Sequence, residues 1–363
     1  MKLGVGAALV RGRFMRGDVE VADGFVTAVG VGGGGGCGLI AVPGFVDLQV
    51  NGFAGVDFLG AAAADYGVAG EALLATGVTA YQPTFVTAAE DALAHALREM
   101  PVSPLPHLLG AHLEGPFLSP ERLGVHDPRF RRDPDLQMLD RLLNTAPITQ
   151  VTLAPELPGS DVLISRLIER GVVVSAGHTD MTAMQAHAAF DSGVATVTHL
   201  FNAMRPFHAR DPGVVGVALT RLDVYVQMIV DGYHLADETV RLIWAAAAGR
   251  VALVTDAIAA AGAEGGSYQL GEQTVTVANG VPTRDDGVLA GSVLTMIDAV
   301  RNLHRLGVPL EAAIEAATTV PARILRRADL GVLAPGQRAD ITILNDRLEV
   351  VRVICQGMAS VTA

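Results

Sequence analysis

The chain has 363 residues, of which 50% are hydrophobic and 18% are charged, and its formal net charge is -12. This length is enough for a large buried core, and the composition has neither a disordered nor a collagen-like bias. The negative charge argues against a nucleic-acid partner, because phosphate backbones need a basic face. An anionic small-molecule ligand would therefore need a pocket with its own arginine, histidine or backbone N–H groups.

The start of the chain does not resemble a secretory signal. The apolar stretch at residues 3–10 is short, and Arg11 and Arg13 follow it without a small-residue cleavage site. No apolar run reaches the roughly 18 residues that a transmembrane helix needs. The two cysteines, Cys37 and Cys355, fit neither a metal motif nor a disulfide framework. We expect a soluble, cytoplasmic protein with inert thiols and no membrane partner.

Both ends of the chain are β-rich. Residues 18–21 and 25–29 near the start, and 339–344 and 350–354 near the end, have the composition of short strands. The glycine run at residues 32–36 indicates a flexible turn, because it lacks the helix and the lysine of a phosphate loop. We predict that residues 1–42 and 331–363 together form a small β-sandwich domain.

Between these ends, short apolar strands alternate with helical stretches. Strands are predicted at residues 44–50, 78–83, 108–113, 148–153, 172–176, 196–200, 225–230 and 251–255, and helices at 66–75, 88–100, 161–170, 182–192, 237–248 and 295–306. Repeated strand–helix units predict a parallel sheet with helices outside it. About eight of them suggest an α/β fold closed into a (β/α)8 TIM-like barrel over residues 43–330. A doubly wound open sheet fits the alternation nearly as well, so the polar motifs must decide.

The polar residues that stand out lie at or just after the ends of predicted strands, and in a barrel these ends meet at one rim. Glu114, His178 and His199 are a carboxylate and two imidazoles from what read as three successive strand ends. Three such ligands with an open position are the arrangement of a catalytic zinc or similar ion. A lone histidine is more often a satisfied core or surface residue, but three ligands on equivalent strand ends favour a metal site.

Asp256 follows the apolar run at residues 251–254. One interpretation is a helix N-cap, since Ala-Ile-Ala-Ala-Ala comes next. The other is a general base, which takes a proton from a metal-activated water and returns it to the leaving amine.

Seven motifs occur in the order seen in N-acetylglucosamine-6-phosphate deacetylases, a branch of the amidohydrolase superfamily. They are Pro43-Gly-Phe-Val-Asp47, His112-Leu-Glu-Gly-Pro-Phe117, Ala176-Gly-His-Thr179, Thr198-His-Leu-Phe-Asn-Ala-Met204, Asp231-Gly-Tyr-His234, Val254-Thr-Asp-Ala257 and Leu289-Ala-Gly-Ser292. The second and fourth are specific to this branch, whereas the first marks only the superfamily. The chain resembles this family over essentially its whole length.

The resemblance implies hydrolysis of the N-acetyl group of N-acetylglucosamine 6-phosphate to glucosamine 6-phosphate and acetate, in amino-sugar catabolism and cell-wall recycling. It implies one divalent metal ion per subunit, zinc first, with iron(II), cobalt(II) or manganese(II) as alternatives. Glu114, His178 and His199 would be its ligands, and Asp256 the acid and base, in a homodimer. The substrate-binding residues that it implies are Val125, His126, Asn202, Ala203, Arg210, His234, Leu289, Ala290 and Gly291.

The guanidinium of Arg210 has the planar fork that matches phosphate oxygens, and in this family the phosphate-binding arginine can come from a neighbouring subunit. Taken alone, Arg210 could equally be a surface charge paired with Asp211, and His126 and His234 could be solvated loop histidines. Other deacetylases of the superfamily, acting on N-acetylgalactosamine 6-phosphate or acyl-amino acids, stay open as alternatives. So does a non-catalytic sugar-phosphate-binding protein.

The first barrel strand departs from a common amidohydrolase pattern. Many members carry His-x-His there, which holds a second metal, whereas this chain has Gln49 and Asn51. Residues two apart on a strand share a face, so both amides point inward, but neutral amides are poor ligands for a transition metal. We therefore expect a single metal, with Gln49, Asn51 and His112 supporting its ligands rather than binding it. The two amides could also simply hydrogen-bond within the barrel mouth.

Overall fold

The computed structural model describes residues 1–32, 38–102 and 105–362. The predicted glycine turn, beyond Gly32, and Cys37 lie outside these ranges. Within the described ranges, none of the helices combines the length and the apolar character that crossing a bilayer requires.

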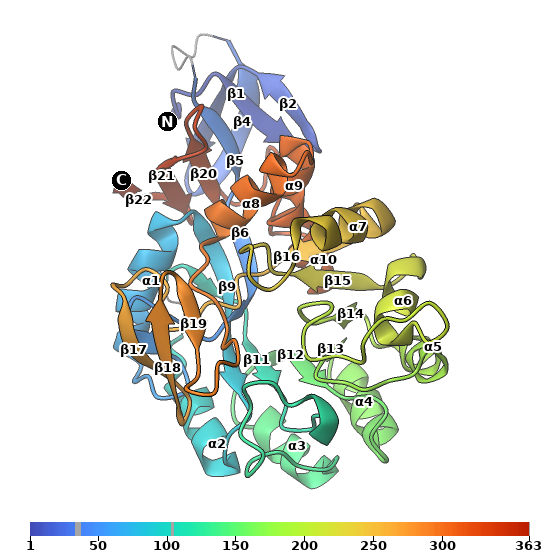
Figure 1. Ribbon diagram of the computed structural model, residues 1–363. Helices are drawn as coiled ribbons and strands as arrows, with labels where there is room; N and C mark the ends of the chain where they lie inside the picture. Colours follow the sequence, from blue (N-terminus) through green and yellow to red (C-terminus); the bar gives the residue numbers. More distant parts are fainter. Residues whose placement is uncertain (33–37, 103–104, 363) are drawn as a thin grey trace.

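A curved parallel sheet occupies the centre of the molecule (Figure 1). Within the described residues its barrel strands are β6 (Phe45–Val50), β9 (Val78–Val86), β11 (Ala111–Glu114), β12 (Ile148–Leu153), β13 (Val173–Ala176), β14 (Thr196–Val197), β15 (Tyr225–Met228) and β16 (Val251–Leu253). Each strand pairs in parallel with the next, from β6 through β9 and β11 to β16. A short strand, β10 (His107–Leu108), pairs with β9 outside this path.

The sheet closes where the segment after β16 meets β6. The backbone N–H of Asp256 donates to the carbonyl of Gln49 over 3.0 Å, and the N–H of Asn51 donates to the carbonyl of Ala257 over 2.7 Å. Val50 and Ala257 form a parallel bridge at the same seam. Because closure leaves no free edge, it confirms the predicted barrel and excludes the doubly wound open sheet.

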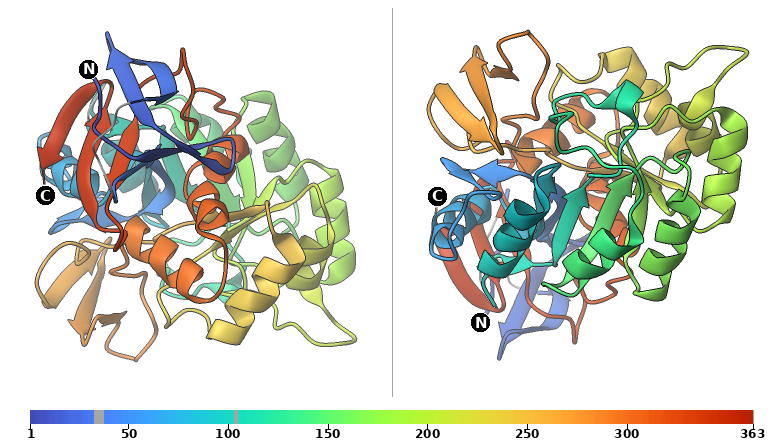
Figure 2. Two further views of the ribbon diagram at one scale, coloured as in Figure 1. Left: turned by 90° about the horizontal axis from the view of Figure 1, so that it is seen from above. Right: turned by 90° about the horizontal axis from the view of Figure 1, so that it is seen from below.

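Helices cover the outside of the barrel, as Figure 2 shows from above and below. They are α1 (Asp65–Ala75), α2 (Glu90–Glu99), α3 (Leu136–Leu143), α4 (Ser160–Glu169), α5 (Ala183–Asp191), α6 (Gly213–Thr220), α7 (Asp237–Ala247), α8 (Met296–Arg305), α9 (Leu310–Ala316) and α10 (Thr319–Ile324), with a 3-10 turn η1 (Pro120–Arg122). Helix α8 buries Met296, Val300 and Leu303, whose spacing forms one apolar face. Helix α5 begins at a capping box of Thr182 and Gln185, which satisfies its first N–H groups.

Segments from the two ends of the chain meet in a separate sheet, near which Figure 1 marks N and C. Its strand order is β2-β1-β5-β20-β21-β22, from β1 (Ala7–Val10), β2 (Arg13–Arg16), β5 (Ile40–Pro43), β20 (Ile341–Leu344), β21 (Val350–Cys355) and β22 (Met358–Thr362). The hairpin of β3 (Asp18–Ala22) and β4 (Phe25–Val31) packs on it through Val19, Val21 and Val26, which meet Ile341 and Ile343. The two chain ends therefore share a core, while the division after residues 42 and 330 stays a prediction.

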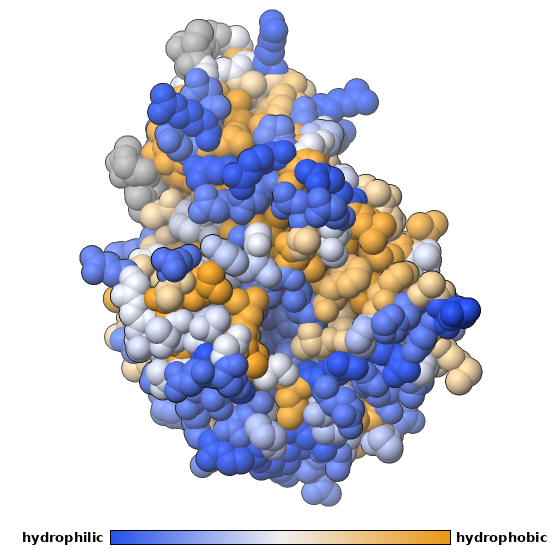
Figure 3. Space-filling view, viewed as in Figure 1, coloured by the Kyte–Doolittle hydropathy of each residue, from blue (hydrophilic) through white to orange (hydrophobic). Residues whose placement is uncertain are grey.

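A small antiparallel sheet that the sequence did not predict stands beside the barrel mouth. It consists of β17 (Gly266–Leu270), β18 (Gln273–Ala278) and β19 (Val281–Thr283), and another hairpin, β7 (Gly52–Phe53) and β8 (Val56–Asp57), follows β6. Leu270 and Val275 attach the small sheet to the barrel by packing against Val86 and Ile258. In the space-filling view, a hollow with apolar surface at its border lies near the middle of the face that Figure 1 shows (Figure 3).

Candidate active site

A cavity of about 230 Å³ lies at the carboxyl ends of the barrel strands, partly covered by the β17–β19 sheet. It is lined by Asn51, Val86, Glu114, Gly124, Val125, His126, His178, His199, Asn202, Ala203, His234, Asp256, Leu270, Val288, Leu289 and Gly291. The structure therefore brings together in one cavity most of the site residues that the sequence predicts, although they are spread over residues 51–291.

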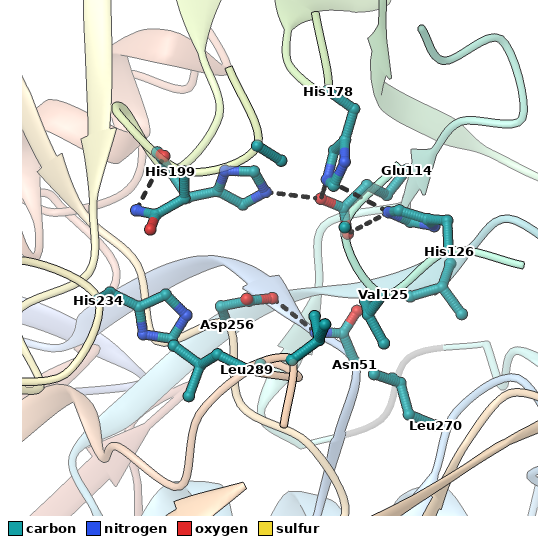
Figure 4. Close-up of a pocket in the computed structure, with 16 residues that line it drawn as sticks. Asn51, Glu114, Val125, His126, His178, His199, His234, Asp256, Leu270 and Leu289 are labelled. Atoms are coloured by element: carbon teal, nitrogen blue, oxygen red, sulfur yellow. Dashed lines mark hydrogen bonds and ion pairs between the residues drawn. The ribbon is translucent and has the colours of Figure 1, made fainter. Parts of the chain in front are cut away.

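The three predicted metal ligands converge at one side of this cavity (Figure 4). Oε1 of Glu114 lies 3.1 Å from Nε2 of His178 and 3.0 Å from Nε2 of His199. Glu114 ends β11, and the two histidines follow β13 and β14. The sequence suggested three successive strand ends. That expectation is wrong, because β12 lies between β11 and β13.

The hydrogen bonds of His178 show why this cluster suits a cation. Its Nδ1 lies 2.9 Å from the carbonyl of Arg122, an acceptor, so the neutral ring carries its proton on Nδ1 and donates it there. The lone pair of Nε2 then faces the carboxylate of Glu114, and two electron-pair donors so close need a positive charge between them. One carboxylate and two imidazoles beside a cavity match the donor set of a catalytic divalent ion. The carbonyl of Arg122 orients the ring of His178, as the outer partners of metal-binding histidines do.

A third imidazole, from His126, stands beside the ligand cluster. The backbone N–H of Thr87 donates to its Nδ1 over 3.2 Å, which places the proton of the neutral ring on Nε2. That Nε2 lies 3.2 Å from Nε2 of His178 and 4.0 Å from Oε2 of Glu114. Burial and the neighbouring His178 lower the pKa of His126 to about 3, so the ring is a neutral N–H donor at the cavity wall.

Asp256 faces the ligand cluster from the barrel seam. Its Oδ1 accepts hydrogen bonds from the side-chain amides of Asn51 over 2.7 Å and Gln49 over 3.0 Å, and Gln49 also donates to Glu114 over 3.2 Å. No α-helix starts at Asp256, so the N-cap interpretation is wrong. The two amides hydrogen-bond within the barrel mouth, and both hold carboxylates in place.

The electrostatics of the two carboxylates differ. Burial raises the pKa of Asp256 to about 6, and the negative charge of Glu114 adds to the increase. Burial alone would also raise the pKa of Glu114, but the close contacts with His178 and His199 hold it well below its usual range. One carboxylate thus stays ionised beside the imidazoles, while the other can exchange a proton near neutral pH.

Gly291 allows the loop after β19 to pass close to Asp256. Its φ is +63°, and a Cβ there would lie 2.5 Å from Cγ2 of Ile258 and 2.8 Å from the carbonyl oxygen of Asp256. Only glycine fits this conformation and this spacing. The neighbouring Leu289 lines the cavity, whereas Ala290 is buried beneath it and its N–H donates to the carbonyl of Pro282.

Two of the predicted residues, Arg210 and His112, do not line the cavity. Arg210 is exposed and does not line the cavity, and the neighbouring Asp211 pairs with Arg205 instead, over 2.7 Å. Both ring nitrogens of His112 face threonine hydroxyls, those of Thr84 at 3.2 Å and Thr152 at 2.7 Å. Burial lowers the pKa of His112 to about 4, so it is a neutral residue of the barrel interior.

His126 and His234 are not solvated loop histidines. His126 is 3% exposed, and the side chain of His234 is 7% exposed. Nδ1 of His234 lies 2.7 Å from the carboxylate of Asp231, which accepts a hydrogen bond from it and leaves Nε2 for the cavity. A backbone carbonyl, a backbone N–H and a carboxylate thus orient the rings of His178, His126 and His234 around this site.

Sequence reasoning missed part of the apolar wall, formed by Val86, Val288 and Leu270. Val86 ends β9, three residues beyond the predicted end of that strand at residue 83. Leu270 belongs to the β17–β19 sheet, where Tyr268 and Leu270 alternate with polar residues, a strand pattern that sequence reasoning passed over. Strand-end position was therefore a usable signal for Val86 and not for Leu270.

A second group of potential ligands, His107, Asp340 and Cys355, lies at the other end of the barrel. Both carboxylate oxygens of Asp340 are already bound, one by Arg338 over 2.6 Å and one by the N–H of Gln356 over 2.8 Å. Burial raises the pKa of the Cys355 thiol, which disfavours a thiolate ligand. This group joins the terminal sheet to the barrel floor.

Comparison with known proteins agrees with this site. The Amidohydrolase family matches residues 40–359. The N-acetylglucosamine-6-phosphate deacetylase of Lysinibacillus sphaericus is 35% identical, over 89% of this chain and 86% of the relative. The N-acetylgalactosamine-6-phosphate deacetylase of Escherichia coli O157:H7 is 36% identical, over 87% of this chain and 86% of the relative.

Among solved structures, a variant of N-acetyl-D-glucosamine-6-phosphate deacetylase from Mycobacterium smegmatis, in complex with N-acetyl-D-glucosamine-6-phosphate, superposes with a TM-score of 0.91 at 34% identity. The match covers 99% of this chain and 98% of that one. The family predicted from the motifs is thereby confirmed, and the chain belongs to the amidohydrolase family, in the branch that contains the N-acetylglucosamine-6-phosphate deacetylases.

Proposed function

We propose that this protein hydrolyses the N-acetyl group of N-acetylglucosamine 6-phosphate, giving glucosamine 6-phosphate and acetate. The observation that carries the proposal is the convergence of Glu114, His178 and His199 opposite Asp256 in one cavity, in a chain of this family. The three ligands would hold one divalent ion, for which we propose zinc, because two imidazoles and a carboxylate with an open position are its usual catalytic set.

The ion, when bound, supplies a Lewis acid that polarises the acetamide carbonyl and makes water more acidic. Asp256 takes the proton of the attacking water and returns it to the amine of the sugar as the C–N bond breaks. Its raised pKa of about 6 suits both directions of this transfer. The Nε2–H of His126 would donate to the acetyl oxygen as negative charge develops on it, and the N–H of Thr87 on Nδ1 supports this tautomer.

The sugar and its phosphate would occupy the part of the cavity lined by Asn202, Ala203 and His234. Val125, Leu289 and Gly291 would contact the ring. Arg210, exposed on the loop beside this wall, would bind the phosphate in its own subunit or in the neighbouring subunit of a homodimer. We also propose a cytoplasmic location, which agrees with a substrate that carries a phosphate.

Acetate release from three substrates tests this function. N-acetylglucosamine 6-phosphate should be hydrolysed with the highest kcat/KM, and unphosphorylated N-acetylglucosamine at least about 10²-fold less well, because a charge-assisted phosphate clamp contributes several kcal/mol. N-acetylgalactosamine 6-phosphate is the competing substrate, since a relative of similar identity is named for it. Higher kcat/KM with that epimer would overturn the sugar assignment, and no acetate from any of them would overturn the activity.

A further inference from the structure

Asp180 lies two residues beyond His178 and joins two arginines from different loops. Its Oδ1 accepts from Nε of Arg122 over 2.7 Å and lies 2.6 Å from Nη2 of the same residue. Its Oδ2 accepts from Nη1 of Arg205 over 2.9 Å. All three side chains are between 26% and 29% exposed, so water screens these pairs only in part.

On one side, Arg122 fastens the segment of residues 178–180 at two points. Its backbone carbonyl accepts a hydrogen bond from Nδ1 of His178 over 2.9 Å, and its guanidinium binds Asp180. The residues that follow Arg122 in the chain, Gly124 to His126, form part of the cavity wall. The bond between the Arg122 carbonyl and the His178 ring does not involve the Asp180 carboxylate, so this wall keeps a second attachment when Asp180 is changed.

On the other side, Arg205 closes the base of the loop at residues 205–211. Its Nε and Nη2 donate to Oδ2 of Asp211 over 2.9 and 2.7 Å, and its backbone N–H donates to the carbonyl of Thr179 over 3.0 Å. His208 and Asp211 exchange backbone hydrogen bonds of 3.0 Å within the same loop. Arg210 precedes Asp211, so the direction in which Arg210 leaves the loop depends on this closure.

We propose that Asp180 is a positioning residue for the phosphate end of the substrate. Through Arg205 it fixes the 205–211 loop against the cavity wall, and so it sets where Arg210 meets the phosphate. The inference rests on the proposed function, in which Arg210 binds that phosphate. We expect a change of Asp180 to alter mainly KM, because Asp180 neither contacts the proposed base Asp256 nor lines the cavity.

The experiment is a double-mutant cycle of Asp180→Asn and Arg210→Ala, with kcat and KM for acetate release from N-acetylglucosamine 6-phosphate. The asparagine keeps the shape of the side chain but presents an NH₂ that cannot accept from a guanidinium. We expect Asp180→Asn to raise KM about ten-fold and to keep kcat within about two-fold of the wild type. The reason is that the charge-assisted contact between Arg210 and the phosphate would be misdirected. The double variant should be no worse than Arg210→Ala, because residues that act through one another are not additive.

Asp140→Asn is the matched control, since Asp140 forms a half-buried pair with Arg166 at 2.9 Å outside the site, and it should leave KM unchanged. Asp211→Asn should reproduce the rise in KM if Asp180→Asn folds poorly. A wild-type KM for Arg210→Ala would overturn the role of Arg210 and the inference with it. A defective Arg210→Ala with additive effects in the double variant, or a loss of bound metal in Asp180→Asn, would overturn the inference alone.

Discussion

The side-chain amide of Asn51 donates to Oδ1 of Asp256 over 2.7 Å, across the seam that closes the barrel. Gln49 donates to the same oxygen over 3.0 Å. Both bonds stabilise the ionised carboxylate, whereas its burial favours the protonated form and raises its pKa to about 6. The residues that take the place of two histidines on the first strand thus control the orientation and the charge of the proposed base.

Asn51→Leu should shift the acid limb of the pH profile of kcat/KM to higher pH. The base works when it is ionised, and loss of a donor to the carboxylate raises its pKa further, so more alkali is needed to ionise it. The profile of kcat/KM against pH measures the shift. Gln82→Leu is the control, because Gln82 is a buried barrel amide that donates to Thr149. An acid limb at the wild-type position in Asn51→Leu would exclude this role for the amide.

Asp256→Asn should retain the fold and the bound metal but lose on the order of 10²-fold or more in kcat, because an amide cannot take the proton. Acetate release gives kcat, and metal analysis of the same preparation shows whether the ligands are intact. Turnover near that of the wild type would rule out Asp256 as the base.

His178→Ala should lose most of its metal and its activity, because two ligands cannot replace three. Metal content per subunit after dialysis measures the loss, and a chelator should have the same effect on the wild-type protein. His187→Ala is the matched control, because His187 is an exposed residue on α5. Full metal content in His178→Ala would require another set of ligands.

Asp47→Asn should flatten the pH dependence of stability between about pH 4 and 7. Burial raises the pKa of Asp47 to about 7, from 3.8, so in this window the folded state holds a proton that the unfolded state has lost. The stability due to this group is full below pH 3.8 and is lost as the pH rises through about 7, with a slope of up to about 1.4 kcal/mol per pH unit.

Asparagine does not titrate, and its NH₂ can donate to the hydroxyl of Thr255, which lies 2.6 Å from Asp47. Denaturant unfolding at several pH values gives the two slopes. The exposed Asp285→Asn should keep the wild-type slope. Equal slopes for wild type and Asp47→Asn would show that Asp47 is ionised in the folded protein throughout this range.

The barrel strands were the most predictable part of the fold, because short β-prone runs recur between helical stretches along the chain. The strand predicted at residues 148–153 coincides with β12. Helix α6 was missed because Val214, Val215, Val217 and Ala218 leave no polar face from which a helical period could be read. The β17–β19 sheet was missed although Val275 and Val277 alternate with Thr274 and Thr276, because its short antiparallel strands stand outside the strand–helix alternation of the barrel.

At the site, residue type predicted the groups that carry chemistry but not those that orient them. Glu114, His178, His199 and Asp256 have side chains that few other roles require at strand ends. The partners that set the ring tautomers are the carbonyl of Arg122 and the N–H of Thr87, and backbone groups leave no mark in a sequence. Arg210 was predicted from its motif position, and its distance from the cavity follows from a loop geometry that sequence does not encode locally.

The position of Asp256 in the closing seam has a consequence for synthesis of the protein. A chain made from its N-terminus presents Glu114, His178 and His199 on earlier strands than the one that delivers Asp256. A nascent chain that ends before β16 has its full set of metal ligands while β6 still has an unpaired edge. The segment that shuts this edge also carries the proposed base, so the barrel closes only when Asp256 is in place.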